Sequence, residues 1–394
     1  MALFRKCSEF ARWIESLRAA RQFFYLREFD PAASPVVAMG GRQLIMLGSN
    51  NYLGLATHPK VVEATIRAVE RYGTGACSSR VLTGTTSLHR RLERRLAEFK
   101  GTEDAVVFST GFMTMMGAIS ALAAEGDVVF SDELNHASIV TGCRLTRAEV
   151  LIYRHNDMHD LEEKLTSCDP DRAKLIVTDG VFSMRGTIAD LPGIKRLADA
   201  HGAAVMVDDA HGTGVLGATG RGTLEHFGME GEIDLMCGTF SKSLGTTGGF
   251  VASEADVVTF LKLRSRPFIF SASPPPASMA TVLACLDVIE QEPQHLARLR
   301  ENTTIMKAGL ADLGYRLEET VTPIVPVLIG DETTTFRMAG ELEDEGVVVN
   351  PVVAPAVPPD SALIRVSVMA SLEIEQLETA LEKFGLVGRR LGII

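Results

Sequence analysis

The sequence predicts an α/β protein with a mostly parallel, seven-stranded sheet and a smaller α+β domain at its C-terminal end. Two observations support this fold. First, short apolar segments alternate with helical segments between about residues 100 and 285, a pattern typical of a parallel sheet covered by helices on both faces. Second, the alternation stops near residue 286, and 394 residues are enough for two or three domains.

The composition excludes several classes of protein. A hydrophobic content of 46% and a charged content of 23% are ordinary for a soluble globular protein. The net charge of −11 argues against general binding to nucleic acid or to anionic membranes. Six scattered cysteines without a CxxC pair indicate reduced thiols rather than disulfides or a zinc site, and residues 1–20 lack a signal-peptide core. We therefore expect a cytoplasmic protein.

The N-terminal arm is predicted to span residues 1–45. It begins with a helix that carries apolar residues on one face, namely Phe10, Trp13, Ile14 and Leu17. A short Pro-containing connection then leads into a β-like run at 43–47. Because an arm of this size is too small to form its own core, we expect it to pack on the main body or on a partner subunit.

The large domain is predicted to span residues 46–285. Its segment 105–124 has no charged residue and is about as long as a membrane span. Ser, Thr and Gly at 109–111 instead split this segment into a buried strand, a turn and a buried helix, so we expect no integral membrane segment. The strands of the sheet are expected at 105–108, 128–131, 150–153, 174–178, 203–208, 234–237 and 250–252.

The small C-terminal domain is predicted to span residues 286–394. A long helix at 281–310 leads into it, and a final helix begins at Glu373. Between these helices lie apolar runs at 324–328, 346–350 and 362–368, and a Pro-rich loop at 351–359. The mixture of helices and strands without regular alternation is typical of an α+β domain.

Lys242 lies in the stretch that is richest in chemical information. The sequence Gly-Thr-Phe-Ser-Lys-Ser-Leu-Gly at 238–245 follows an apolar strand and places one lysine between hydroxyl residues and a glycine run. Hydroxyls and backbone N–H groups can hold a phosphate, while a lysine amine can form a Schiff base with pyridoxal 5'-phosphate (PLP). The alternative is a surface lysine in a Gly/Ser loop.

A second phosphate-binding element is predicted at 109–112. The Ser-Thr-Gly-Phe sequence there lies where a strand turns into a helix, so its N–H groups and the helix dipole favour an anion. Alone it could be a simple turn. Together with Thr239 and Ser241 it forms a plausible phosphate cradle.

Polar residues that follow other strands could complete a cofactor site. Asp208 ends an apolar strand and could pair with a protonated pyridine nitrogen, and His211 could bond the phenolic oxygen of the same ring. His136 follows another strand and could stack on a planar cofactor. The alternatives are a solvated loop for Asp208 and His211 and a structural role for His136.

Three further features suggest other functions. The sequence at 212–217 fits the GxGxxG dinucleotide fingerprint, but it neither follows a strand directly nor opens a helix. His155 and His159 have the spacing of two metal ligands, although Asp157 resembles a helix start, and we predict no metal site. Arg365 lies on an apolar strand and indicates either a bidentate carboxylate partner or an internal ion pair.

Four motifs together resemble a known family. They are Ser-Asn-Asn-Tyr-Leu-Gly-Leu at 49–55, Asp-Asp-Ala-His-Gly at 208–212, Gly-Thr-Phe-Ser-Lys-Ser at 238–243 and Ile-Arg-Val-Ser at 364–367. In order and spacing they are similar to those of the α-oxoamine synthases, which are fold-type I PLP enzymes, and the likeness covers nearly the whole chain. The lysine motif and the Pro-rich segment 350–358 most resemble the soluble bacterial serine palmitoyltransferase branch.

The resemblance implies a role for each candidate site residue. It assigns Lys242 to the Schiff base and to catalytic proton abstraction, His136 to stacking on the ring, Asp208 to the pyridine nitrogen and His211 to the phenolic oxygen. The phosphate would be held by Gly111, Phe112, Thr239 and Ser241, joined by Ser271 or Ser273 from a second subunit. The carboxylate of the amino-acid substrate would bind to Asn50 and Arg365, and Ser79 would be a further substrate-binding residue.

The activity that the resemblance implies is a PLP-dependent condensation by a cytoplasmic homodimer with its active site at the subunit interface. An amino acid, in the first place L-serine, would join an acyl thioester such as palmitoyl-CoA with loss of CO2, giving a 3-keto amine for sphingolipid biosynthesis. One alternative is a synthase of the 8-amino-7-oxononanoate, 2-amino-3-ketobutyrate, aminolevulinate or specialised-metabolite type. Others are a PLP aminotransferase and a non-catalytic partner subunit, against which the presence of Lys242 argues.

Overall fold

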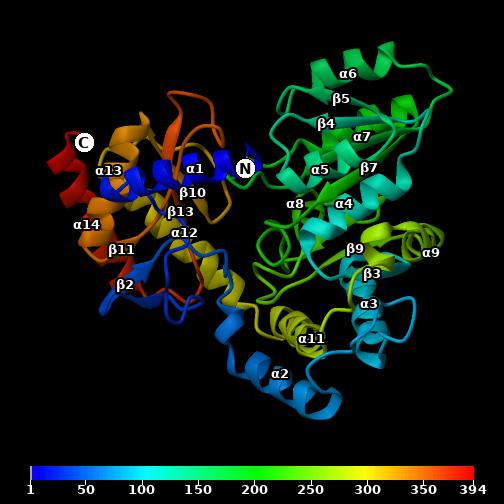
Figure 1. Cartoon of the computed structure of the whole chain (residues 1–394), viewed down its shortest axis with the longest axis horizontal. Coiled ribbons are helices and arrows are strands. Elements are labelled where there is room, and N and C mark those ends of the chain that lie inside the picture. The colour runs from blue at the N-terminus through cyan, green and yellow to red at the C-terminus, as the bar shows by residue number, and fades with distance from the viewer. Residues whose placement is uncertain (1) are drawn as a thin grey trace. The chain divides into compact units, whose positions relative to one another are not determined.

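The computed structural model describes residues 2–394 and divides them into two compact units (Figure 1). One unit combines the residues up to Asn50 with Met184–Gly186 and Arg298–Ile394, and the other comprises Asn51–Ser183 and Thr187–Ala297. The sequence predicted a separate arm and a boundary at 285/286. The N-terminal residues instead group with the C-terminal segment, because strand β2 (Arg42–Met46) pairs in parallel with β11 (Val347–Val348).

A seven-stranded sheet forms the centre of the Asn51–Ala297 unit. Its strand order is β3-β9-β8-β7-β6-β4-β5, and only β9 runs antiparallel to its neighbours. The predicted mostly parallel sheet is therefore confirmed. The strands are β3 (Asp104–Phe108), β4 (Val128–Asp132), β5 (Glu149–Tyr153), β6 (Lys174–Asp179), β7 (Ala203–Asp208), β8 (Leu235–Thr239) and β9 (Gly249–Ser253).

Helices cover both faces of this sheet. Successive residues of β4 alternate between two apolar cores, with Val129 in one and Val128 and Phe130 in the other. The first core is closed by α4 (Gly111–Leu122), α5 (Ala137–Leu145), α9 (Ala255–Arg264) and α10 (Arg266–Ile269). The second core is closed by α6 (Met158–Ser167), α7 (Leu191–His201) and α8 (Thr223–Phe227).

The charge-free segment after residue 104 is a strand followed by a helix, as predicted. Strand β3 ends at Phe108, and Thr110 caps α4 by accepting a hydrogen bond from the Met113 N–H at 3.1 Å. The helix has only 12 residues. Across residues 2–394 we find no helix with the length and apolar character needed to cross a membrane.

Four longer helices and one short helix complete this part of the chain. The sequence predicts one helix at 281–310, but the structure has two, with a break at Glu292 and Pro293. Proline lacks an N–H and disfavours the helical conformation in the residue before it, and Glu292 indeed leaves the helix with φ of −128° and ψ of 65°. The helices are η1 (Leu55–Thr57), α2 (Pro59–Tyr72), α3 (Ser87–Lys100), α11 (Pro276–Gln291) and α12 (Gln294–Asp312).

The other unit contains two three-stranded sheets around a separate apolar core. One sheet has the order β1-β2-β11 and the other the antiparallel order β10-β13-β12. The core includes Val37 and Leu44 from the N-terminal strands and Ile364 and Phe384 from the C-terminal segment. Its remaining elements are α1 (Ala2–Ala19), β1 (Val36–Met39), β10 (Ile324–Gly330), α13 (Glu332–Asp344), β12 (Asn350–Val352), β13 (Ala362–Ser367) and α14 (Ile374–Leu391).

Candidate active site

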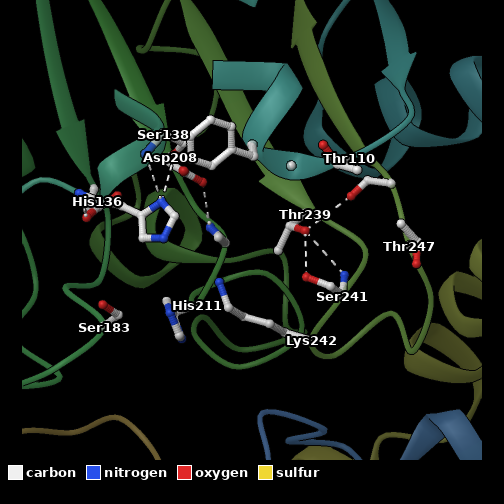
Figure 2. A pocket seen from close by; sticks show the side chains of 15 residues that line it. Thr110, His136, Ser138, Ser183, Asp208, His211, Thr239, Ser241, Lys242 and Thr247 are labelled. Carbon is white, nitrogen blue, oxygen red and sulfur yellow. Dashed lines mark hydrogen bonds between the residues drawn. The ribbon is translucent and has the colours of Figure 1, made fainter. Parts of the chain in front are cut away.

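A cavity of about 390 Å³ opens where the parallel strands of the seven-stranded sheet end (Figure 2). Asp179 and Asp208 are register partners on β6 and β7, and the ends of β7 and β8 are likewise aligned. The side chains that follow these strands therefore meet at one edge of the sheet. The cavity lining includes the following predicted residues: Gly111, Phe112, His136, Asp208, His211, Thr239, Ser241 and Lys242.

Lys242 lies in the loop that connects β8 to β9. Backbone hydrogen bonds close this loop, from the Phe240 N–H to the Gly248 carbonyl and from the Thr246 N–H to the Phe240 carbonyl, both at 2.9 Å. Gly248 has a φ of +140°, and a Cβ there would lie 2.4 Å from the Phe240 ring. These contacts define the backbone of the loop, and Figure 2 shows the amino end of Lys242 directed into the cavity beside His211.

The start of α4 and the end of β8 form the predicted anion cradle. The first N–H groups of a helix have no partner within the helix, and the helix dipole adds a positive potential there. A Cβ on Gly111 would lie 2.7 Å from the Thr239 side chain, so only glycine allows this close approach. The Thr239 and Ser241 hydroxyls lie 2.9 Å apart on the opposite side. The cradle can bind a phosphate.

Asp208 is the buried carboxylate of the cavity. Only 7% of its surface is exposed, and it accepts a hydrogen bond from the Ala210 N–H at 3.1 Å. Burial raises the pKa of Asp208, while the nearby charges of Lys242 and His136 lower it to a smaller extent. A cationic ring nitrogen would supply the charge partner that a buried carboxylate requires.

His136 is held at the start of α5, where it serves as the N-cap. Its backbone N–H donates to the Asp179 carboxylate at 2.9 Å, and its ring Nδ1 lies 2.8 Å from the Ser138 hydroxyl. His136 as a residue is exposed and lines the cavity, so a planar group can lie against its ring. Partial burial of the imidazole lowers the pKa of His136, because it disfavours the charged form, and the Asp208 charge opposes this effect. Burial, together with the Asp208 charge, raises the pKa of Asp179 well above its usual range.

His211 is oriented by Tyr52. The Tyr52 hydroxyl lies 2.7 Å from His211 Nδ1, and both residues are buried. Such a contact fixes the ring orientation and determines which nitrogen faces the cavity. Tyr52 belongs to the predicted motif at 49–55, but its role was not predicted, because its partner lies 159 residues away in the sequence.

A buried ion pair supports the segment that carries Asp208 and His211. Lys100, at the end of α3, donates to the Asp209 carboxylate at 2.9 Å and to the Thr213 hydroxyl at 2.8 Å. The side chains of Lys100 and Asp209 are 3% and 2% exposed. The Thr223 N–H also donates to Asp209, at 3.2 Å. The Asp209 carboxylate and Lys100 therefore link α3, the segment after β7 and the start of α8.

We expect Lys100→Met to lower the free energy of unfolding by about 3–5 kcal/mol, because it leaves the buried Asp209 carboxylate without its charge partner. Lys195→Met is the matched control, since Lys195 pairs with the exposed Asp199 on the surface of α7 and its loss should cost less than about 1 kcal/mol. Urea denaturation of the two variants measures the difference. Equal losses for both would show that the buried pair does not support the loop.

The remaining predicted residues do not line this cavity. The Ser273 hydroxyl donates to the Gly84 carbonyl at 2.7 Å, Ser271 contacts the Met113 sulfur at 3.7 Å, and Ser79 forms a β-bridge with Ala272. Asn50 and Arg365 belong to the other unit. There the Arg365 guanidinium donates to Asn50 Oδ1 at 3.2 Å and to the Ser367 hydroxyl at 2.6 Å.

The structure disfavours two of the alternative interpretations. The glycine-rich segment 212–217 forms turns, and the next helix starts only at Thr223, so a dinucleotide fingerprint is absent from it. His155 precedes α6 and contacts Asp132 at 3.1 Å, whereas His159 is exposed and lies beside Glu163. Asp157 caps α6, as the sequence indicated. The two histidines therefore do not face a common ion.

Several residues that line the cavity were not predicted as site residues from the sequence. Asp179 ends a strand as Asp208 does, and this shared position was the signal that could have identified it. Thr110 lies within the predicted turn at 109–112. Ser138, Ser183 and Thr247 carry no local signal, because their hydroxyls reach the cavity only through the fold.

The assembled side chains fit one class of ligand. They comprise a lysine amine, a cradle for a phosphate, a buried carboxylate and an exposed imidazole face around one cavity. An aromatic aldehyde that bears a phosphate and a basic ring nitrogen satisfies each of these groups. PLP has this chemistry.

Comparisons with known proteins agree with this fit. The family model of the class I and II aminotransferases matches residues 42–384. The chain is 45% identical over 370 residues to a serine palmitoyltransferase of Sphingobacterium spiritivorum, covering 94% of this chain and 93% of the relative. It is also 45% identical over 382 residues to an 8-amino-7-oxononanoate synthase of Symbiobacterium thermophilum, covering 97% of each. A solved serine palmitoyltransferase from S. paucimobilis with a bound PLP–myriocin aldimine superposes with a TM-score of 0.96 at 38% identity, over 100% of both chains.

Proposed function

This chain belongs to the α-oxoamine synthases within the class I and II aminotransferase family, and from this premise we propose that it joins L-serine to the acyl group of an acyl-CoA, with release of CO2 and of the CoA thiol. The product is a 3-keto amine, and palmitoyl-CoA is the proposed acyl donor. The observation that carries the proposal is a cavity that places an amine, a phosphate cradle and a buried carboxylate together, in a chain 45% identical to a serine palmitoyltransferase.

Lys242 is the proposed anchor of the cofactor and the proposed base. When bound, PLP supplies an aldehyde that reacts with amines and a ring that accepts the electron pair released at the amino-acid Cα. The Lys242 amine would hold the cofactor in the absence of substrate. Lys242 Nζ would also take the Cα proton of the bound amino acid, since backbone hydrogen bonds close the loop that presents this lysine to the cavity.

The surrounding residues orient the ring and set its charge. Asp208 would pair with the ring nitrogen and keep it protonated, which would strengthen the ring as an electron acceptor. His211, oriented by Tyr52, would bond the phenolic oxygen. His136 would lie against the ring face and exclude water from it.

The substrate-binding residues are proposed in the same way. Asn50 and Arg365, which are hydrogen-bonded to each other, bind the carboxylate of the amino acid, and Ser79 contributes to substrate binding. We also propose a cytoplasmic homodimer whose active site lies at the subunit interface. In it, Ser271 or Ser273 of the second subunit joins Thr239 and Ser241 at the phosphate.

We expect Gly111→Ala to weaken PLP binding about 10- to 100-fold. The added Cβ would lie 2.7 Å from the Thr239 side chain and would push apart the two sides of the phosphate cradle. Gly75→Ala is the control, because a Cβ at Gly75 has no atom within 4 Å. Titration of the PLP-free protein with PLP, followed by visible absorbance, gives both affinities. An unchanged affinity for Gly111→Ala would place the phosphate elsewhere.

A second candidate function keeps the reaction type but changes the substrates. The 8-amino-7-oxononanoate synthase of Symbiobacterium thermophilum is as similar in sequence as the serine palmitoyltransferase of Sphingobacterium spiritivorum. This equality favours a synthase that uses alanine, or glycine, as the alternative to serine. The structural similarity to the S. paucimobilis enzyme over the full length of both chains supports serine.

Absorbance spectra with individual amino acids test the choice. The PLP-loaded protein is mixed with L-serine, L-alanine, glycine and, as a control, D-serine. We expect a saturable change in the visible spectrum with L-serine at the lowest concentration. A change with alanine or glycine but not with serine would reject the serine assignment, and release of a keto acid without any thioester would indicate an aminotransferase.

A further inference from the structure

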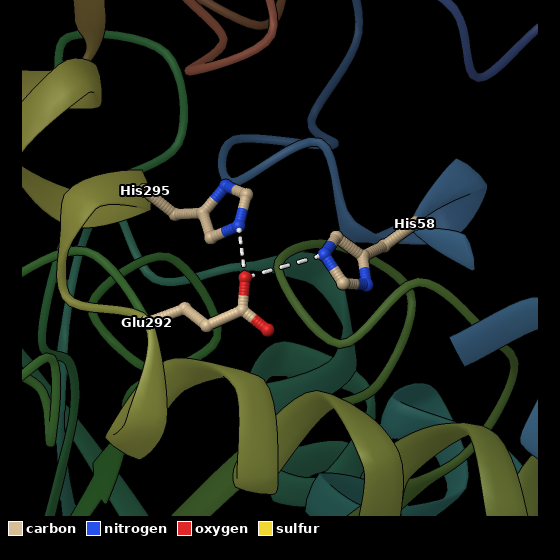
Figure 3. Close-up of side chains that lie close together, drawn as sticks. All are labelled: His58, Glu292 and His295. Carbon is tan, nitrogen blue, oxygen red and sulfur yellow. Dashed lines mark hydrogen bonds and ion pairs between the residues drawn. The ribbon is translucent and has the colours of Figure 1, made fainter. Parts of the chain in front are cut away.

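A second group of chemically reactive side chains lies outside the cavity. His58, Glu292 and His295 gather within the Asn51–Ala297 unit, and Figure 3 shows both imidazole rings directed at one carboxylate. His58 is the residue before α2, Glu292 is the C-cap of α11, and His295 lies in the first turn of α12. The break at Pro293 brings the last two residues to the same side.

The distances in this cluster are long for hydrogen bonds. Glu292 Oε2 lies 3.5 Å from His58 Nε2 and 3.4 Å from His295 Nε2. Hydrogen bonds from histidine to a carboxylate are ordinarily about 2.7–3.2 Å long. Two ligands that each lie about 2.0–2.2 Å from a tetrahedral Zn²⁺ are separated by roughly 3.3–3.6 Å. The two histidine–carboxylate distances match the second arrangement.

The surroundings hold the cluster in a form that can bind a cation. The side chains of His58, Glu292 and His295 are 14%, 18% and 26% exposed, so the site is sheltered but open to solvent. Lys60 donates a hydrogen bond to Glu292 Oε1 at 2.6 Å, which leaves Oε2 facing the imidazoles. The Gln294 amide also approaches Oε2, at 3.3 Å.

The donor set indicates which cation fits. The three donor atoms all lie within 4.8 Å of one another. His58 Nδ1 is buried without a hydrogen-bond partner among residues 2–394, so Nε2 is the nitrogen of this ring that meets a polar group. Two imidazoles and one carboxylate, with a fourth position open to water, are a donor set typical of Zn²⁺.

We propose that His58, Glu292 and His295 form a Zn²⁺ site that ties the start of α2 to the junction of α11 and α12. This departs from the sequence-based prediction of no metal site. Bound Zn²⁺ would replace the two long histidine–carboxylate contacts by metal–ligand bonds. The site lies on the same stretch of chain as Tyr52, which orients His211, so metal binding would stiffen a segment that supports the cavity.

Metal titration of the full-length, PLP-loaded protein tests the proposal. The protein is stripped of metal with a chelator, and Zn²⁺ binding is measured by calorimetry. Co²⁺ is then used as a spectroscopic probe, because tetrahedral Co²⁺ absorbs strongly in the visible range. The variants are Glu292→Gln and His295→Gln. His159→Gln is the matched control, since His159 also lies beside a glutamate but is 76% exposed.

We expect one Zn²⁺ per chain and a tetrahedral Co²⁺ spectrum for the wild type and for His159→Gln. Glu292→Gln and His295→Gln should each lose at least about 100-fold in affinity, since removal of a ligand should cost no less than the loss of an outer-shell partner. Circular dichroism and the PLP absorbance confirm that each variant is folded. Absence of stoichiometric binding, or binding that both variants retain, would overturn the proposal and leave a hydrogen-bonded cluster only. These readouts do not depend on catalytic activity.

Discussion

Lys242→Ala is expected to lower the rate of product formation by at least about 10³-fold. The variant loses the amine that holds the cofactor and that takes the Cα proton, and no other lysine lines the cavity among residues 2–394. It should also lack the visible absorbance band of the lysine-bound cofactor. Mass-spectrometric quantification of the product and an absorbance spectrum measure the two effects.

Lys164→Ala is the control for this experiment, because Lys164 lies on α6 and pairs with Asp160. It should keep both the absorbance band and the activity. Full activity of Lys242→Ala would contradict the role of Lys242 and would support the interpretation of the chain as a non-catalytic partner subunit.

Asp208→Asn is expected to lower the rate by about 10²- to 10³-fold while stabilising the PLP-free protein. The rate falls because an amide cannot hold the ring nitrogen protonated. Stability rises because burial raises the pKa of Asp208 in the folded state above its value in the unfolded chain. Such a group favours folding below the unfolded pKa, and this contribution is lost as the pH rises through the folded pKa. The carboxylate therefore destabilises the PLP-free protein near neutral pH.

Thermal unfolding of the PLP-free protein at neutral and at mildly acidic pH tests the stability part. We expect Asp208→Asn to raise the Tm at neutral pH, and to raise it less in acid, where the wild-type carboxyl group is already protonated. Asp199→Asn is the control, since Asp199 is 64% exposed on α7. A lower Tm for Asp208→Asn at neutral pH would contradict the assignment of Asp208 as a buried charge that awaits a cationic partner.

Much of the fold could be predicted because its signal is local. The strands of the large sheet are short runs rich in apolar residues, and the inner strands β4, β6 and β8 are buried along their whole length, on both faces of the sheet. The break between α11 and α12 was missed although the sequence marks it, since Pro293 lies within the polar run at 290–295 that separates Ile289 from Leu296. Strand β1 was missed because its four residues gain their stability from pairing with β2.

The site was predictable to the extent that its residues follow strands. Lys242, Asp208 and Thr239 stand at strand ends or in the loop after one, where the topology of a parallel sheet brings side chains together. Tyr52 could not be assigned in the same way, because its contact depends on how the chain returns to the cavity. The cluster of His58, Glu292 and His295 gave no signal, since more than two hundred residues separate its first member from the others.

Condensation of L-serine labelled with ¹³C at its carboxyl carbon is the most direct test of the proposed reaction. The PLP-loaded protein is incubated with this serine and palmitoyl-CoA, and both the gas phase and the extracted products are analysed by mass spectrometry. We expect labelled CO2 together with an unlabelled 3-keto amine in equal amounts. Label retained in a keto acid, with no product containing the acyl chain, would contradict it.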